Sequence, residues 1–166
     1  MDAAEPPVWL LDVDGVINVR RPRWSAAPHK GVAVAEGVGW PLRWAPALVA
    51  RIRRLHRDGV VEARWCSTWC AWPTEIERAL RMPPLPRAFG DVPDFSVAKL
   101  AAARAVLLGG RRLVWTDDVV VPEPGPLRDE FTAGGRALLI RPDPRHGLTP
   151  AHMDEIERWA RLTDTA

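Results

Sequence analysis

Short apolar runs alternate along this chain with longer segments of helical periodicity, and this alternation limits the folds that are possible. The first run, VWLL at residues 8–11, is apolar at every position and is followed at once by turn residues. Runs of this kind are typical of strands buried on both faces, as in parallel sheets. Further strands are predicted at residues 60–67, 111–118 and 136–142.

The segments between these strands carry signals for helix starts and ends. Pro46 suits a first helical position and Gly59 a helix end, with apolar residues at helical spacing between them. Further helices are predicted from about residue 73, at 96–108, at 124–132 and at 150–162. Strands that alternate with helices predict an α/β fold with a mainly parallel sheet covered on both faces, a Rossmann-like three-layer sandwich.

The length of the chain suits one domain. A chain of 166 residues, of which 47% are hydrophobic, can bury one sizeable core. We therefore expect a single domain over residues 1–166. The stretch 18–44, rich in Arg, Pro, Gly and Trp, is expected to be a flap or loop insertion, with a hairpin as one option. It is too short for a separate cap domain.

Composition argues against several other classes of protein. A net charge of +2 attracts anions only weakly and does not by itself indicate nucleic acid. Cys66 and Cys70 are too few for a disulfide framework or a structural zinc site, and we expect them to be buried. No apolar run approaches the roughly 20 residues of a membrane span, and no apolar signal region is visible. We expect a cytoplasmic protein without a membrane partner.

Polar side chains follow three of the predicted strands. In open α/β sheets, ligands bind beyond the carboxyl ends of the strands, so these side chains are expected to converge at one edge. They are Asp12 and Asp14 after the first strand, Ser67 and Thr68 after the second, and Asp117 and Asp118 after the third.

Four carboxylates at one edge of a sheet repel one another and call for a cation. A site in which a few carboxylates and water molecules supply oxygen ligands suits Mg²⁺ better than zinc. Two hydroxyl groups and a lysine nearby suit a bound phosphate, whose charge a metal ion and the lysine would offset while a carboxylate attacks.

Four motifs in this chain resemble those of the haloacid dehalogenase superfamily, whose members are mostly phosphohydrolases. The first is LLDVDGV, in which the first strand ends in Asp-x-Asp-Gly, and the second is RWCST, in which the second strand ends in Ser and Thr. The third is SVAKL, which places Lys99 on a helix, and the fourth is LVWTDD, in which the third strand ends in an acidic pair. All four occur in order over roughly residues 8–118, and their joint occurrence is far more specific than any one of them.

The resemblance implies roles for the acidic residues. Asp12 would be the nucleophile that forms an aspartyl-phosphate, and Asp14 the general acid for the leaving group and then the base for water. Mg²⁺ would be held by Asp12, the backbone carbonyl of Asp14 and Asp117. Asp118 would ligate through water or orient its neighbour.

The resemblance also implies roles for the remaining motif residues. Ser67, helped by Thr68, would hydrogen-bond the phosphoryl group, and Lys99 would offset the charge of nucleophile and phosphate. Gly15, placed among the substrate-binding residues, frees the backbone to turn sharply after the first motif.

Each motif taken singly has an ordinary structural explanation. DVDG and TDD are common turn sequences, Ser67–Thr68 suits a helix cap, and Lys99 suits a solvated helix position. An EF-hand calcium loop that starts at Asp12 is excluded, because its sixth and twelfth positions hold Ile17 and Arg23.

The sequence therefore predicts a Mg²⁺-dependent phosphomonoesterase that acts on a phosphorylated small molecule or a nucleotide. Two alternatives stay open: a phosphatase of nucleotides or nucleic-acid ends, and a binding or regulatory module without turnover. The segment Arg20–Trp24 bears on the nucleic-acid alternative, because arginines and an aromatic ring can grip phosphates and bases. Trp69 is a further candidate for a substrate pocket.

Overall fold

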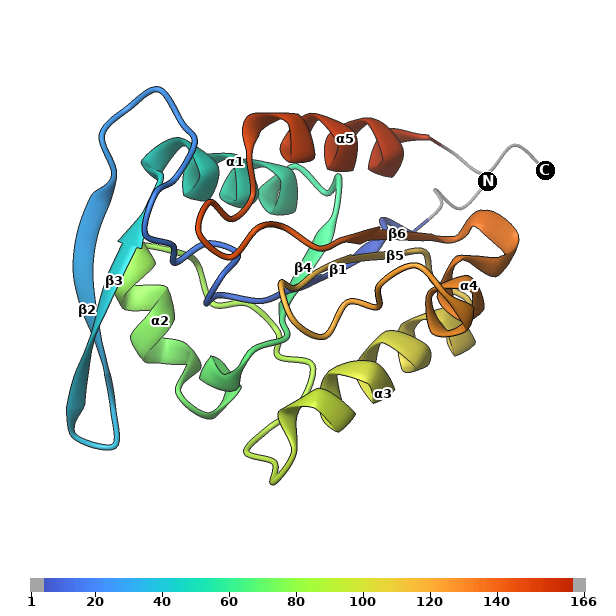
Figure 1. Cartoon of the computed structure of the whole chain (residues 1–166), viewed down its shortest axis with the longest axis horizontal. Helices are drawn as coiled ribbons and strands as arrows, with labels where there is room; N and C mark the ends of the chain where they lie inside the picture. Colours follow the sequence, from blue (N-terminus) through green and yellow to red (C-terminus); the bar gives the residue numbers. More distant parts are fainter. Residues whose placement is uncertain (1–4, 163–166) are drawn as a thin grey trace.

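A four-stranded parallel sheet forms the centre of the structure, a computed structural model in which residues 5–162 are described (Figure 1). The strand order is β4-β1-β5-β6. The strands are β1 (Val8–Leu11), β4 (Glu62–Trp65), β5 (Leu113–Thr116) and β6 (Ala137–Ile140). The prediction of an α/β fold with a parallel sheet is confirmed. Strands β4 and β5 are shorter than predicted, so Ser67, Asp117 and Asp118 lie in the loops that follow them, and Thr68 begins a 3₁₀ turn.

Helices flank this sheet on both faces. Helices α1 and α5 lie on one face, and α3 and α4 lie on the other (Figure 1). The helices are α1 (Pro46–Arg57), α2 (Pro73–Leu80), α3 (Phe95–Leu108), α4 (Pro126–Thr132) and α5 (Pro150–Arg161), with two 3₁₀ turns, η1 (Thr68–Ala71) and η2 (Ala133–Gly135). Four of the five helices begin at a proline, where its fixed φ angle suits the first turn and its missing N–H costs nothing.

Strand β1 supplies side chains to two apolar cores. Trp9 and Leu11 pack in the core under α1 and α5, while Val8 and Leu10 pack in the core with residues of α3 and α4. Successive side chains of a strand point to opposite faces, so an uninterrupted apolar run fits a strand covered on both sides. Cys66 and Cys70 are buried free thiols, as expected.

Much of the loop predicted at residues 18–44 is a β-hairpin. Strands β2 (His29–Ala35) and β3 (Val38–Trp44) pair antiparallel through the turn residues Glu36 and Gly37, whose φ angles are 52° and 75°. Positive φ at both central residues gives the turn whose twist matches that of the strands. The sequence signal was weak because β3 contains Gly39 and Pro41, which disfavour strands.

The hairpin packs on α2 and lies beyond the carboxyl ends of the central strands (Figure 1). Its buried residues Ala33, Ala35, Leu42 and Trp44 belong to the same core as Ile76 and Leu80 of α2. Over residues 5–162, no helix is both long and apolar enough to cross a membrane.

A buried carboxylate ties α2 to the sheet. Glu77 Oε1 accepts hydrogen bonds from Trp65 Nε1 and from the backbone N–H of Leu85, each at 2.9 Å. These contacts join the edge strand β4, helix α2 and the proline-rich connection that follows. Loss of the acceptor would leave two buried donors without a partner.

Glu77→Ala is expected to lower the free energy of unfolding by about 2–4 kcal/mol, because two buried N–H groups lose their acceptor. Glu77→Gln keeps an oxygen at the same place and is expected to lose less than half as much. Urea unfolding followed by circular dichroism measures both. Equal losses in the two variants would contradict the role of the shared acceptor.

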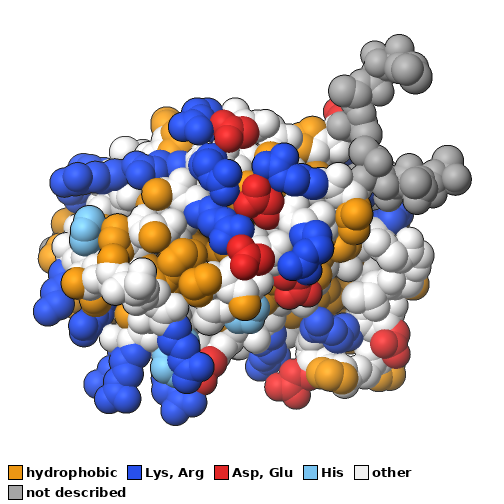
Figure 2. Space-filling model, turned by 90° about the horizontal axis from the view of Figure 1, so that it is seen from above, with side chains coloured by type: hydrophobic (Ala, Val, Ile, Leu, Met, Phe, Trp, Pro, Cys, Tyr) orange, Lys and Arg blue, Asp and Glu red, His pale blue; other side chains and the backbone are white. Residues whose placement is uncertain are grey.

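Charged side chains alternate in sign over the face that α1 and α5 form (Figure 2). Arg51 and Arg54 of α1 donate to Glu157 of α5 at 3.0 and 3.1 Å, and Arg161 donates to the same carboxylate at 2.9 Å. The hydrogen bonds from Arg161 hold the pKa of Glu157 below its ordinary value of 4.5, although partial burial opposes this.

A lowered pKa means that ionised Glu157 stabilises the folded state above pH 4.5, and that this contribution is lost as the pH falls through the folded-state pKa. Glu157→Gln is expected to cost about 1 kcal/mol of unfolding free energy at pH 7 and clearly less near pH 3, where the ionised form is being lost. Thermal unfolding at the two pH values checks this. Glu155→Gln, which changes an exposed acid of the same helix, is the control. An equal loss of unfolding free energy in this variant would contradict a stabilising role for the ion pairs of Glu157.

Candidate functional site

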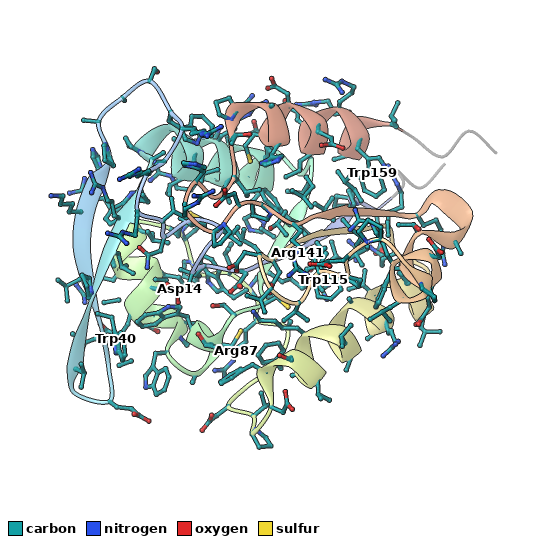
Figure 3. All side chains as sticks on the ribbon, viewed as in Figure 1. Asp14, Trp40, Arg87, Trp115, Arg141 and Trp159 are labelled. Atoms are coloured by element: carbon teal, nitrogen blue, oxygen red, sulfur yellow. The ribbon has the colours of Figure 1, made fainter. Side chains whose placement is uncertain are left out.

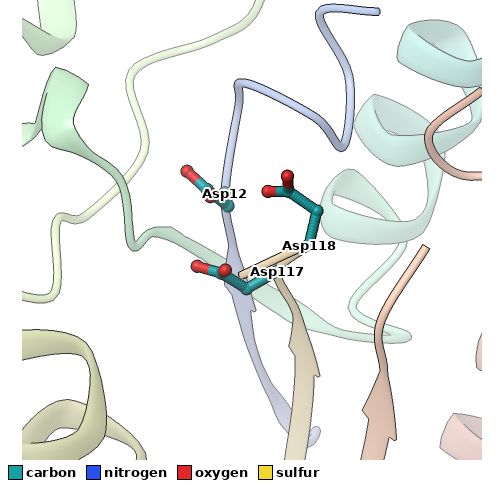
Figure 4. Close-up of side chains that lie close together, drawn as sticks. All are labelled: Asp12, Asp117 and Asp118. Carbon is teal, nitrogen blue, oxygen red and sulfur yellow. The ribbon is translucent and has the colours of Figure 1, made fainter. Parts of the chain in front are cut away.

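Three aspartates meet where the chain connections leave the sheet in opposite directions. From β1 the chain crosses to β4 on one side, whereas β5 leads on to β6 on the other side. Such a switch point opens a crevice at the carboxyl ends of the two strands. Asp12 follows β1, and Asp117 and Asp118 follow β5; carboxylate oxygens of all three lie within 4.8 Å of one another (Figure 4).

Lys99 joins two of these carboxylates. It lies on α3, and its Nζ donates to Asp12 Oδ2 at 2.9 Å and to Asp117 Oδ2 at 2.6 Å. Lys99, Asp12 and Asp117 are all buried. The interpretation of Lys99 as a solvated helix residue is therefore wrong, and its position beside the acidic residues agrees with the motif order.

Backbone N–H groups hold the other oxygens of this triad. Asp12 Oδ1 accepts from the N–H of Val13 at 2.8 Å, and Asp117 Oδ1 accepts from those of Val119 and Val120 at 2.8 and 2.7 Å. Sequence reasoning missed these donors, because loop geometry and not side-chain identity supplies them. Both carboxylates are thereby fixed in orientation.

Burial shifts the pKa values of these groups. It raises the pKa of Asp12 to about 8, an effect that Lys99 opposes and Asp117 increases. Burial acts to lower the pKa of Lys99, but Asp12 and Asp117 outweigh it and raise that pKa. Burial and Asp117 also raise the pKa of Asp118. Asp12 and Asp118 are therefore harder to ionise than ordinary aspartates, and a further cation beside them would favour their charged forms.

The donor set of the crevice suits a small divalent cation. Three carboxylates and one ammonium group leave a formal charge of −2 when all are ionised. Oxygen ligands in this number are those that Mg²⁺ takes, with water completing the octahedron. Asp118 is the more accessible acid of the LVWTDD motif, while the oxygens of Asp117 are engaged by Lys99 and the backbone.

Gly15 leaves room for Asp118. Its φ angle is +76°, and a Cβ atom at this position would lie 2.3 Å from Asp118 Cγ and Oδ2. Glycine is thus required both by the backbone conformation and by the packing of the carboxyl group. The expected sharp turn is present, and the contact with Asp118 is a feature that the sequence did not reveal.

Asp14 lies apart from the three clustered aspartates. Its Oδ1 accepts from Asn18 Nδ2 at 2.7 Å and its Oδ2 from Trp69 Nε1 at 3.1 Å. The side chain is exposed and lines a cavity of about 340 Å³ on the side of the hairpin (Figure 3). Asn18 and Trp69 are the residues that orient it. Trp69 was a candidate for a substrate pocket, but its bond to Asp14 was not foreseen, since the two residues are far apart in sequence.

Ser67 and Thr68 lie next to the end of β1 but in different surroundings. The N–H of Cys66 donates to the carbonyl of Leu11 at 2.9 Å, which brings the loop after β4 beside that after β1. Ser67 is fully buried, and its Oγ accepts from the N–H of Trp69 at 3.2 Å, so it also caps η1. Thr68 is exposed and lines the same cavity as Asp14.

The side chains of the segment Arg20–Trp24 lie in two different surroundings. Arg20 and Arg21 line a separate open cavity of about 720 Å³ together with Lys30 and Arg43. Trp24 is half-buried, and its Nε1 donates to the carbonyl of Leu148 at 2.8 Å, so its indole N–H is taken up by the fold. The hydrogen bond engages the edge of the indole, and the interpretation of Arg20–Trp24 as a nucleic-acid contact stays a prediction.

Arg141 is a second cation that sequence reasoning missed. It follows β6 directly (Figure 3), and its charge, like that of Lys99, acts to lower the pKa of Asp118 against the effects of burial and Asp117. Its position immediately after the fourth strand was the signal available, since residues beyond each strand end face the same edge.

No protein-family model, curated protein or solved structure matches this chain. The resemblance to the haloacid dehalogenase superfamily therefore stays a prediction, and the function is argued from the site itself.

Magnesium is expected to stabilise the protein through this site. At Mg²⁺ concentrations of ten to a hundred times the Kd, the free energy of unfolding should rise by about 1.4–2.7 kcal/mol. Asp118→Asn should remove most of this gain, because one ligand and one charge are lost. Asp129→Asn, on an exposed acid of α4, is the control. Thermal unfolding with and without Mg²⁺ measures the difference.

Gly15→Ala offers a second test of the same site with every carboxylate retained. The added methyl group should displace Asp118 and weaken the Mg²⁺ response as Asp118→Asn does. A full Mg²⁺ response in both variants would rule out Asp118 as a ligand.

Proposed function

We propose that this protein is a Mg²⁺-dependent phosphomonoesterase of the haloacid dehalogenase type, with Asp12 as the nucleophile. The observation that carries the proposal is the buried Asp12–Lys99–Asp117 triad beside Asp118 at the switch point of the sheet. Neither a turn nor a solvated helix face requires a lysine buried between two carboxylates, and a phosphoryl-transfer site does.

The substrate in this proposal is a phosphate monoester, of a small molecule or a nucleotide. Asp12 and Asp118 would hold a bound Mg²⁺, which would offset the charge of the phosphoryl oxygens, while Asp117 holds Lys99 beside Asp12. Lys99 contributes a fixed positive charge, with its Nζ 2.9 Å from Asp12 Oδ2. The hydroxyl of Ser67 can donate to a phosphoryl oxygen while its Oγ still accepts from the N–H of Trp69.

In the first step, a carboxylate oxygen of Asp12 attacks phosphorus and the bond from phosphorus to the ester oxygen breaks. The leaving oxygen takes a proton from the carboxyl group of Asp14. The N–H of Val13 and the ammonium group of Lys99 hold Asp12 in place and limit the rotation of its side chain.

In the second step, Asp14 takes a proton from a water molecule that attacks the aspartyl-phosphate. The bond between Asp12 and phosphorus breaks, inorganic phosphate leaves, and both aspartates return to their starting states. Asn18 and Trp69 support this role of Asp14, since they fix its carboxyl group at the wall of the open cavity, where a leaving group has room.

Hydrolysis of 4-nitrophenyl phosphate tests this function. Wild-type protein is expected to release nitrophenol only with Mg²⁺, and Asp12→Asn to lose at least about a thousandfold in kcat, because the nucleophile is removed. Asp91→Asn, on an exposed loop acid, should keep wild-type rates.

Equal rates in Asp12→Asn and wild type, with both folded by circular dichroism, would exclude Asp12 as the nucleophile. A wild-type protein that binds Mg²⁺ but hydrolyses no phosphate ester would instead favour the alternative of a binding module.

A further inference from the structure

The cavity beside Asp14 lies between the hairpin and η1 and takes no part in the carboxylate cluster. Its volume of about 340 Å³ lies within the range of pockets that bind small ligands, roughly 300–1,000 Å³. Three indoles line it, those of Trp40, Trp69 and Trp72, together with Asp14, Glu36 and Thr68. Aromatic walls on more than one element give it the character of a ligand pocket.

Trp40 is the residue that sets this cavity apart from ordinary surface. Side chains alternate along β3, so Trp40 shares the inward face of the hairpin with Leu42 and Trp44, which are both buried. Trp40 nevertheless stays 53% exposed, because the cavity lies beneath it. An inward-facing indole without a cover offers a flat apolar surface on which a planar group can stack.

The charges of the cavity restrict what can bind. Among the described residues that line it, the charged ones are Asp14 and Glu36, and both are acidic. The basic side chains of Lys30 and Arg43 project from the opposite face of the hairpin, where they are cross-strand neighbours. A group with its own negative charge would meet repulsion in this cavity, whereas a neutral aromatic ring would not.

We propose that this cavity binds the leaving group of the substrate, and that this group is a planar aromatic alcohol without negative charge, such as a nucleoside or an aryl alcohol. The inference rests on the proposed phosphatase function. Asp14 connects the cavity with the proposed catalytic site, because it belongs to the cavity wall and comes two residues after Asp12. A group stacked in the cavity would place its ester oxygen on the side of the general acid.

The test compares two phosphate esters of a ribose 5-hydroxyl group, adenosine 5′-monophosphate and ribose 5-phosphate, which carry adenine and a hydroxyl group, respectively, at the anomeric carbon. Release of inorganic phosphate at saturating Mg²⁺ gives kcat and KM for each. Stacking of the base should raise kcat/KM for the nucleotide at least about tenfold over the sugar phosphate. Benzyl phosphate, run alongside, distinguishes a nucleoside site from a general aryl site.

Trp40→Ala should raise KM for the nucleotide about tenfold with kcat within about twofold, and should leave ribose 5-phosphate unaffected. Trp40→Phe keeps a ring and should recover most of the loss. Val32→Ala is the matched control, since Val32 belongs to the same hairpin, is 52% exposed and faces outward.

A further comparison of substrates tests the argument from the charges of the cavity. Adenosine 3′,5′-bisphosphate, whose leaving group is an anion, should be hydrolysed more slowly than the monophosphate. Glu36→Asn removes one negative charge and suits the left-handed backbone at this turn position. This variant should reduce the difference in hydrolysis rate between the monophosphate and the bisphosphate.

Binding of adenosine, measured by calorimetry, separates the two proposals. Phosphate release that is equal for both esters and unchanged in Trp40→Ala would overturn the inference and leave the phosphatase standing. Adenosine binding that depends on Trp40, in a protein that hydrolyses no ester, would support the cavity as an aromatic site and overturn the phosphatase.

Discussion

The buried ion triad of Lys99 with Asp12 and Asp117 is the interaction on which the site depends. Transfer of a charged group from water into a protein interior costs several kcal/mol, and a partner must offset it. Here one ammonium group serves two carboxylates that come from adjacent strands, while backbone N–H groups satisfy their outer oxygens. Removal of Lys99 would leave two buried acids facing each other, at a cost of about 3–5 kcal/mol.

The topology of the sheet explains why the triad forms at this place. The connections from β1 and β5 lead away in opposite directions, so no crossover segment fills the space above their carboxyl ends. Helix α3 runs along the face of β5 and carries Lys99 into that space. The crevice therefore follows from strand order, and the sequence needs only an acid at each strand end and a lysine on one helix.

The sequence predicted those parts of the fold and site that depend on local pattern. Continuous apolar runs located β1 and β5, and prolines located the starts of α1, α2 and α5, whereas α4 begins at Pro126, two residues later than predicted. The motifs located Asp12, Lys99, Asp117 and Asp118. Features that depend on contacts between distant segments were not accessible: the bond from Trp69 to Asp14, the support of Asp118 by Gly15, and the cation Arg141. The hairpin was only an option, since Gly39 and Pro41 weaken its strand pattern. Ser67 fits both of its interpretations, because one hydroxyl caps η1 and still has a proton to donate.

The two aspartates of the first motif, separated by one residue, occupy opposite kinds of surroundings. Asp12 is enclosed with Lys99 in the crevice, whereas Asp14 is exposed and held from both sides by neutral donors, Asn18 and Trp69. The proposed mechanism needs such a difference, because a nucleophile and a proton donor must have different affinities for protons, and two carboxyl groups in like surroundings would not. The turn at Gly15 and the hairpin that follows create it. The hairpin also forms the far wall of the cavity that Asp14 lines, so in the proposed mechanism it would shape the surroundings of the proton donor.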